Sequence, residues 1–171
     1  MKKLLLIVNP CSGTGKIRPV LLGVVEEFAK AGYDVTVYPT KHREDATKKI
    51  ATLKTKDYDL LVACGGDGTL NEVITGLMRS RADIPIGYIP SGTLNEWSTG
   101  LGISKTIRKA AKDIVSGKEI TLDIGKFGDK YFTYTASFGA FTSASYSANQ
   151  DVKNVLAKRH TFLRVLNRSV K

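Results

Sequence analysis

Three glycine-rich turns contain the residues of this sequence that are best suited to chemistry. They read NPCSG at 9–13, GGDGT at 65–69 and SGT at 91–93. Glycine lets backbone N–H groups approach a ligand closely, and the N-terminus of a following helix adds a partial positive charge. The turns also supply hydroxyl groups, from Ser12, Thr69, Ser91 and Thr93. Together they predict a cradle for phosphate groups.

Asp67 stands in the middle of the second turn, where its negative charge needs an explanation. A carboxylate repels phosphate unless a cation lies between them, and Mg²⁺ commonly bridges phosphate oxygens. An aspartate in such a turn can also be an Asx-turn residue or a helix cap. For an isolated GDG the structural explanation would be the better one. Beside two other phosphate-like turns, we predict that Asp67 takes part in a network of phosphate and Mg²⁺.

The pentapeptide GTLNE occurs twice, at 68–72 and at 92–96. One copy could be ordinary capping, since acids stabilise the first turn of a helix. Two identical copies after neighbouring predicted strands predict one site built from both.

Two common nucleotide motifs are missing. A P-loop requires GxxxxGK[ST], which the stretch from Pro10 to Ile17 does not match. A dinucleotide fingerprint requires GxGxxG, and neither 13–15 nor 66–68 continues to the third glycine. A Rossmann cofactor site is therefore not expected.

The segments between the turns alternate between strand and helix patterning. Short apolar runs predict strands at 4–8, 35–38, 60–63 and 84–89. Apolar residues at three- and four-residue spacing predict helices at 20–28, 44–54, 69–78 and 94–100. Ser104 is placed to cap a further helix, whose apolar face would be Ile107, Ala110, Ala111 and Ile114. This alternation predicts an α/β fold, a parallel sheet with helices on both faces, whose ligands bind beyond the carboxyl ends of the strands.

The patterning changes near residue 119. The stretch at 119–139 alternates and turns at Gly128-Asp129, which predicts an antiparallel hairpin. We therefore predict an α/β domain over 1–120 and the beginning of an antiparallel β-sandwich domain over 121–171. The final stretch, 153–171, carries six Lys/Arg and no acid, which fits a basic amphipathic helix.

Charge and cysteine content narrow the classes of protein further. The formal net charge is +10, of which residues 1–100 contribute +2 and residues 101–171 contribute +8. Such asymmetry fits an anionic partner, or simply a solvated basic face. The two cysteines, without a CxxC, argue against a disulfide framework or a zinc site and indicate a reducing cytoplasm. The apolar run at 4–8 is too short for a signal peptide, so we expect a soluble chain.

The motifs NPCSG, GGDGTLNEV and IPSGTLNEW, at these spacings, resemble the diacylglycerol kinase catalytic domain of bacterial lipid kinases and sphingosine kinases. The resemblance covers residues 1 to about 150 and implies a fold like that of NAD kinases and diacylglycerol kinases. It implies that ATP binds between two domains and that Mg²⁺ is held by Asp67 and Glu96. The ATP-binding residues that it implies are Asn9, Pro10, Cys11, Ser12, Gly13, Thr40, Gly65, Gly66, Asp67, Gly68, Thr69, Leu70, Asn71, Glu72, Ser91, Gly92, Thr93 and Asn95.

The sequence departs from the family pattern in four respects, of which length is the largest. Asn95-Glu96 stands where Asn-Asp is usual, and Trp97-Ser98-Thr99 replaces Phe-Ala-Arg. The segment after Lys153 also differs from the family's Gly-Lys-x-Ala-Tyr pattern. Family members are about twice as long by this resemblance, which places the general base beyond residue 171.

The resemblance implies an ATP- and Mg²⁺-dependent lipid kinase, or its amino-terminal part, with Asp67 as the catalytic residue present. Its partners would be a lipid such as diacylglycerol and an anionic membrane surface, reached from the cytoplasm as a peripheral protein. One alternative is a NAD kinase-like enzyme with a soluble acceptor, against which the NPCSG turn and the third motif weigh. Another is a nucleotide-binding module without catalysis, whose open sheet edges could pair in a homodimer. Nucleic acid is not an expected partner, because no aromatic-rich basic motif accompanies the charge.

Overall fold

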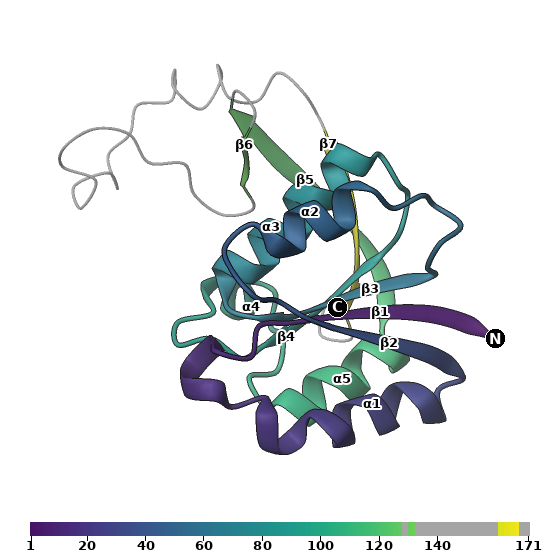
Figure 1. The fold of residues 1–171 in the computed structure, drawn as a ribbon, viewed down its shortest axis with the longest axis vertical. Coiled ribbons are helices and arrows are strands. Elements are labelled where there is room, and N and C mark those ends of the chain that lie inside the picture. Colours follow the sequence, from purple (N-terminus) through teal and green to yellow (C-terminus); the bar gives the residue numbers. More distant parts are fainter. Residues whose placement is uncertain (128–129, 133–160, 168–171) are drawn as a thin grey trace, which may run out of the picture.

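The computed structural model describes residues 1–127, 130–132 and 161–167. Its centre is a seven-stranded sheet with the order β2-β1-β3-β4-β7-β5-β6 (Figure 1). The strands are β1 (Lys2–Val8), β2 (Tyr33–Pro39), β3 (Leu60–Gly65), β4 (Ile86–Pro90), β5 (Lys118–Phe127), β6 (Lys130–Phe132) and β7 (Thr161–Asn167). The helices are α1 (Leu21–Lys30), α2 (Asp45–Ala51), α3 (Asp67–Ser80), α4 (Glu96–Gly100) and α5 (Ile107–Ser116).

The first four strands are parallel, as the alternation predicts. β1 pairs with β2 and β3, and β3 pairs with β4, all in the same direction. The middle strands are continuous apolar runs because helices cover both of their faces. Leu4, Leu5 and Leu6 of β1, for example, are all fully buried.

The helices form two layers, one on each face of the sheet (Figure 1). One apolar cluster joins the sheet to α2 and α3 through residues such as Ile50 and Ile74. The other joins it to α1 and α5 through residues such as Phe28 and Ile114. The predicted fold class, a parallel sheet with helices on both faces followed by antiparallel strands, is therefore confirmed. None of the helices in the described part of the chain has the length and apolarity needed to cross a membrane.

The predicted antiparallel hairpin is present, since β5 and β6 pair antiparallel through Gly125 and Phe132. Its turn at Gly128-Asp129 and the stretch from 133 to 139 lie outside the described residues. The division into domains at residue 120 stays a prediction. β5 begins at Lys118 and joins the same sheet as the parallel strands, through β7.

The prediction of a helix over 153–171 is wrong for residues 161–167, which form β7. β7 is parallel to β4 at Ile86 and Val165, and antiparallel to β5 along its length. Leu163 and Val165 are fully buried while Arg164 between them is partly exposed, which is the two-residue period of a strand. Arg164 forms ion pairs with Glu119 and Asp83 that fasten β7 to its neighbours. Residues 153–160 and 168–171 lie outside the described residues.

Two predicted element ends are also corrected. β4 begins at Ile86, two positions later than predicted, because the chain still runs as a loop through Ile84 and Pro85. The helix expected after Ser104 has Thr106 as its N-cap residue. The Ser104 hydroxyl instead accepts the N–H of Thr106 at 3.2 Å, one step before the helix begins.

Candidate functional site

The three glycine-rich turns meet at one rim of the sheet. They follow β1, β3 and β4, which are adjacent and parallel, so their carboxyl ends lie together. A methyl group added to Gly13 would lie 2.1 Å from the carbonyl oxygen of Ser91. One added to Gly92 would lie 2.5 Å from Cα of Gly66. These glycines are therefore required where one turn packs on another, a reason that the sequence alone did not show.

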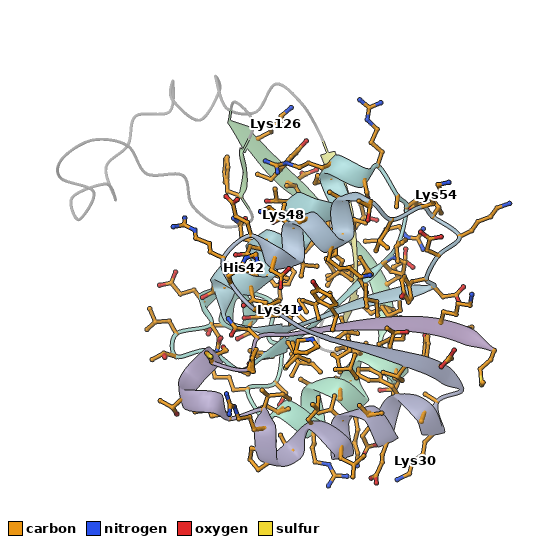
Figure 2. The ribbon with its side chains drawn as sticks, viewed as in Figure 1. Lys30, Lys41, His42, Lys48, Lys54 and Lys126 are labelled. Carbon is orange, nitrogen blue, oxygen red and sulfur yellow. The ribbon has the colours of Figure 1, made fainter. Side chains whose placement is uncertain are left out.

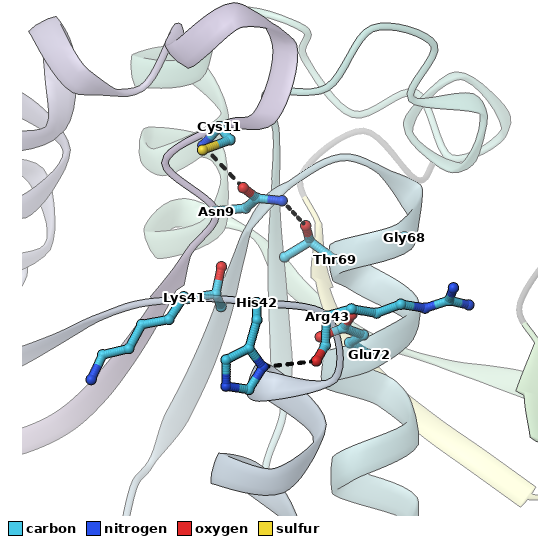
Figure 3. Close-up of a pocket in the computed structure, with 9 residues that line it drawn as sticks. Asn9, Cys11, Lys41, His42, Arg43, Gly68, Thr69 and Glu72 are labelled. Carbon is cyan, nitrogen blue, oxygen red and sulfur yellow. Dashed lines mark hydrogen bonds between the residues drawn. The ribbon is translucent and has the colours of Figure 1, made fainter.

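Asn9 connects the first turn to the second (Figure 3). Its side-chain N–H donates to the hydroxyl of Thr69 at 3.1 Å, and its side-chain oxygen accepts the N–H of Cys11 at 3.0 Å. Its own backbone N–H donates to the carbonyl of Cys64 at 2.9 Å. The side chain thus fixes the position of two turns at once.

Asp67 connects the second turn to the third. It is the first residue of α3, but its carboxylate accepts N–H groups from the start of α4, those of Glu96 at 3.0 Å and Trp97 at 3.3 Å. The capping explanation of this aspartate therefore holds, although the helix that it caps is not its own. The two GTLNE copies are brought together by this contact. Each carboxylate oxygen keeps a further lone pair, so capping leaves room for a cation.

Asn95 and Ser91 shape the third turn from within. The buried side chain of Asn95 accepts the N–H of Gly92 at 3.0 Å and donates to the carbonyl of Gly92 at 2.8 Å. Ser91 is 1% exposed and donates its backbone N–H to the carbonyl of Gly65 at 2.8 Å. Burial raises the pKa of the neighbouring Cys64 thiol to about 12, so this cysteine stays protonated. These residues form the base of the site.

A pocket of about 380 Å³ opens beside the rim (Figure 3). Its lining includes six of the residues predicted to bind ATP: Asn9, Cys11, Thr40, Gly68, Thr69 and Glu72. The other predicted ATP-binding residues and Glu96 do not line it. Leu70 is 1% exposed and belongs to the core, while the side-chain oxygen of Asn71 is buried without a hydrogen-bond partner.

Three further residues that belong to none of the sequence motifs also line the pocket: Lys41, His42 and Arg43. They directly follow Thr40, which donates its N–H to the carbonyl of Val8 at 2.8 Å where β2 ends beside β1. The signal that could have found them is their place, since β2 ends at the same rim as the glycine-rich turns. Figure 3 shows the side chain of Lys41 pointing away from Asn9 and Thr69, so its backbone faces them.

The basic side chains of the described residues are spread around the molecule rather than gathered at this pocket. Figure 2 shows Lys30 at the end of α1, Lys54 after α2, and Lys126 on β5. Positive charge at the pocket therefore comes from the few residues that follow β2.

The residues at the rim fit a polyphosphate better than a free metal ion. A methyl group on Gly68 would meet no atom within 4 Å, so the bare backbone at the start of α3 faces open space. Among residues 1–127, 130–132 and 161–167, no three His, Cys, Asp or Glu side chains converge on a common point. Mg²⁺ that is held mainly by phosphate oxygens and water needs only one or two carboxylates, and Asp67 could supply one of them.

The family of the chain follows from sequence similarity over the same region. The family profile described as "Diacylglycerol kinase catalytic domain" matches residues 3–127, which include all three turns. The chain belongs to this family.

Proteins named diacylglycerol kinase are similar to this chain over most of its length. One from Staphylococcus carnosus strain TM300 is 36% identical over 89% of this chain and 50% of its own. One from Bacillus subtilis strain 168 is 34% identical over 96% of this chain and 54% of its own. A crystal structure of a diacylglycerol kinase from Bacillus anthracis strain Sterne superimposes with a TM-score of 0.70 at 35% identity, covering 77% of this chain and 45% of that one. The chain spans about half the length of the curated relatives it matches.

Proposed function

We propose that this chain is the nucleotide-binding part of an ATP- and Mg²⁺-dependent lipid kinase. The reaction would transfer the γ-phosphoryl group of ATP to the hydroxyl of a lipid such as diacylglycerol. Family membership and the names of the relatives support the kinase class and the lipid acceptor. The observation that carries the nucleotide site is Gly68, whose bare backbone borders a pocket that is lined by residues of the first two turns.

In this proposal the chain's own residues bind and orient the triphosphate. Backbone N–H groups at the start of α3 face the phosphates, where the helix dipole favours negative charge. Thr69 and Asn9 present a hydroxyl and an amide beside them, already joined at 3.1 Å. Mg²⁺, held with the phosphates near Asp67, would neutralise their charge. The base that deprotonates the acceptor hydroxyl is expected beyond residue 171.

The membrane partner, the homodimer and the cytoplasmic location remain predictions. A lipid acceptor requires access to a bilayer, and exposed lysines and arginines attract anionic lipid. Two alternative functions also remain open to experiment. One is a nucleotide-binding module that transfers no phosphoryl group, and the other is a kinase for a soluble acceptor such as NAD.

Substitution of Gly68 tests the nucleotide site directly. Gly68→Ala places a methyl group where we expect phosphate, so it should weaken ATP binding about tenfold, the effect of a steric cost of about 1.4 kcal/mol. It should not harm the fold, because alanine in a helix is more stable than glycine by about 0.5–1 kcal/mol. Calorimetric titration with ATP and Mg²⁺, together with urea unfolding, measures both effects.

Gly100→Ala is the matched control, because Gly100 is also helical and also has no atom within 4 Å of an added methyl group. It should leave ATP affinity unchanged. Equal affinities for all three proteins would contradict the site, and an absence of heat with the unaltered chain would contradict the function. Phosphate transfer to diacylglycerol in mixed micelles, compared with transfer to NAD, then separates the lipid kinase from its alternatives.

A further inference from the structure

One wall of the pocket is a short loop, residues 40–44, between β2 and α2. Thr40, Lys41, His42 and Arg43 of this loop all line the pocket. The opposite side is the start of α3, with Gly68 and Thr69. The width of the pocket therefore depends on where the 40–44 loop is held relative to α3.

The beginning of the loop is fastened to β1 and α2. Thr40 donates its N–H to Val8 at 2.8 Å, and Lys41 donates its N–H to the carboxylate of Asp45 at 2.8 Å. The hydroxyl of Tyr38 donates to the same carboxylate at 2.9 Å. These donors, the Lys41 N–H first, hold the pKa of Asp45 below its ordinary value. Asp45 therefore stays ionised and keeps this end of the loop in place at neutral pH.

The end of the loop is fastened to α3 by one side chain. Glu44 has a φ of 66°, a left-handed conformation that is unfavourable for a residue other than glycine. Its N–H donates to a carboxylate oxygen of Glu72 at 2.9 Å. The hydroxyl of Thr47, one turn further along, donates to the backbone carbonyl of Glu72 at 3.0 Å. Glu72 thus holds the loop in a conformation that Glu44 would not adopt by preference.

The charge of Glu72 also argues against a role as a direct phosphate ligand. Its carboxylate is negative, and carboxylates and phosphates repel each other without a cation between them. One of its oxygens already accepts a backbone N–H, which directs its charge toward the loop. Figure 3 shows Arg43, the residue before Glu44, extending across α3 near Glu72. Placing Glu44 therefore also places the basic residues that precede it.

We infer that Glu72 is a positioning residue for the proposed nucleotide site: it holds the 40–44 loop against α3 through the N–H of Glu44. This inference rests on the proposed function, because that function makes the pocket a nucleotide site. Without the carboxylate, the loop leaves the binding-competent position for part of the time. The apparent affinity for ATP is then the intrinsic affinity multiplied by the fraction of time that the loop spends in the binding-competent position.

The test compares Glu72→Ala with Glu72→Gln in the complete 171-residue chain. Glutamine keeps an oxygen that can accept the Glu44 N–H but loses the charge. NMR amide exchange reports whether the Glu44 N–H is still bonded, and calorimetry with ATP and Mg²⁺ gives the affinity. We expect Glu72→Ala to speed exchange at Glu44 and weaken ATP binding about tenfold, as for a loop that is competent about a tenth of the time. We expect Glu72→Gln to restore both measurements.

The controls separate this inference from the proposed function. Glu26→Ala removes an equal charge from an exposed site on α1 and should change neither measurement. If Glu72→Ala does not fold, Glu72→Met replaces it, with similar volume and no oxygen. Equal loss of affinity in Glu72→Ala and Glu72→Gln, with the Glu44 amide still protected in the latter, would overturn the inference by showing that the charge itself binds. Unchanged affinity in Glu72→Ala despite faster exchange overturns it as well. If the unaltered chain binds no ATP, the proposed function fails and the inference fails with it.

Discussion

Asp67 illustrates how one side chain at the rim serves both structure and chemistry. Its two carboxylate oxygens accept the first N–H groups of α4, so it holds the third turn against the second. The sequence raised the structural and the functional explanation as alternatives. The geometry shows that the structural role exists and leaves lone pairs for the other. The two roles can be separated by a change that keeps an acceptor but removes the charge.

Asp67→Asn is that change. It retains one acceptor oxygen for α4, so it should cost less stability than Asp67→Ala, for which we expect about 1 kcal/mol, the usual cost of losing a helix cap. Both variants should lose Mg²⁺-dependent ATP binding, because neither carries the charge. Urea unfolding measures the first effect and calorimetry with and without Mg²⁺ the second. Normal Mg²⁺-dependent binding by Asp67→Asn would show that Asp67 is only structural.

The turns behave as one unit because their glycines pack on each other. Gly92→Ala tests this packing. The added methyl group would lie 2.5 Å from the backbone at Gly66, which cannot move without shifting the whole second turn. We expect a loss of about 3 kcal/mol of unfolding free energy, at the upper end of overpacking costs. Gly68→Ala in the neighbouring turn is the reference, because its methyl group meets nothing. Equal stability of the two variants would contradict the packed arrangement.

The elements that the sequence predicted well are those whose patterning is strong and local. The strands at 4–8 and 60–63 are continuous apolar runs, and both faces of each are covered as expected. The stretch at 161–167 is assigned wrongly from the sequence because the six basic residues of 153–171 suggest the surface of a helix. Its alternation becomes decisive only when β4 and β5 lie on either side of it, and those contacts come from distant parts of the chain.

The same limit applies to the site. Motif resemblance located the rim, but it could not separate residues that face the pocket from residues that form its base. Asn95 and Ser91 belong to the motifs and are nevertheless buried beneath the surface of the turn. His42 belongs to no motif and lines the pocket. Exposure depends on how three distant turns fold over one another, which spacing along the chain does not encode.

The molecule as a whole depends on β7, which lies between β4 and β5. A chain cut at residue 127, where the family match ends, would lose it. β4 would then have an open edge, and β5 would have no partner strand in the main sheet. Both strands could pair only with each other or with strands of another copy of the chain. We therefore expect chain 1–127 to aggregate, because unpaired edges associate.

Size-exclusion chromatography with light scattering compares chain 1–127 with the 171-residue chain. The Arg164→Met substitution in the complete chain is the control: it removes the ion pairs of β7 but keeps its backbone pairing. It should remain as dispersed as the unaltered chain. A monomeric, cooperatively folding chain 1–127 would contradict the importance of β7.

The insertion of β7 also has a consequence for the order of folding. Arg164 and Asp83, which meet beside β4, are 81 positions apart along the chain. Contacts between such distant segments form slowly, because a long stretch of chain must first be brought together at an entropic cost. On a ribosome the four parallel strands would emerge before β7 and wait with an incomplete sheet. Among the described strands β7 is synthesised last, and it would close a gap near the centre of the sheet rather than extend its rim.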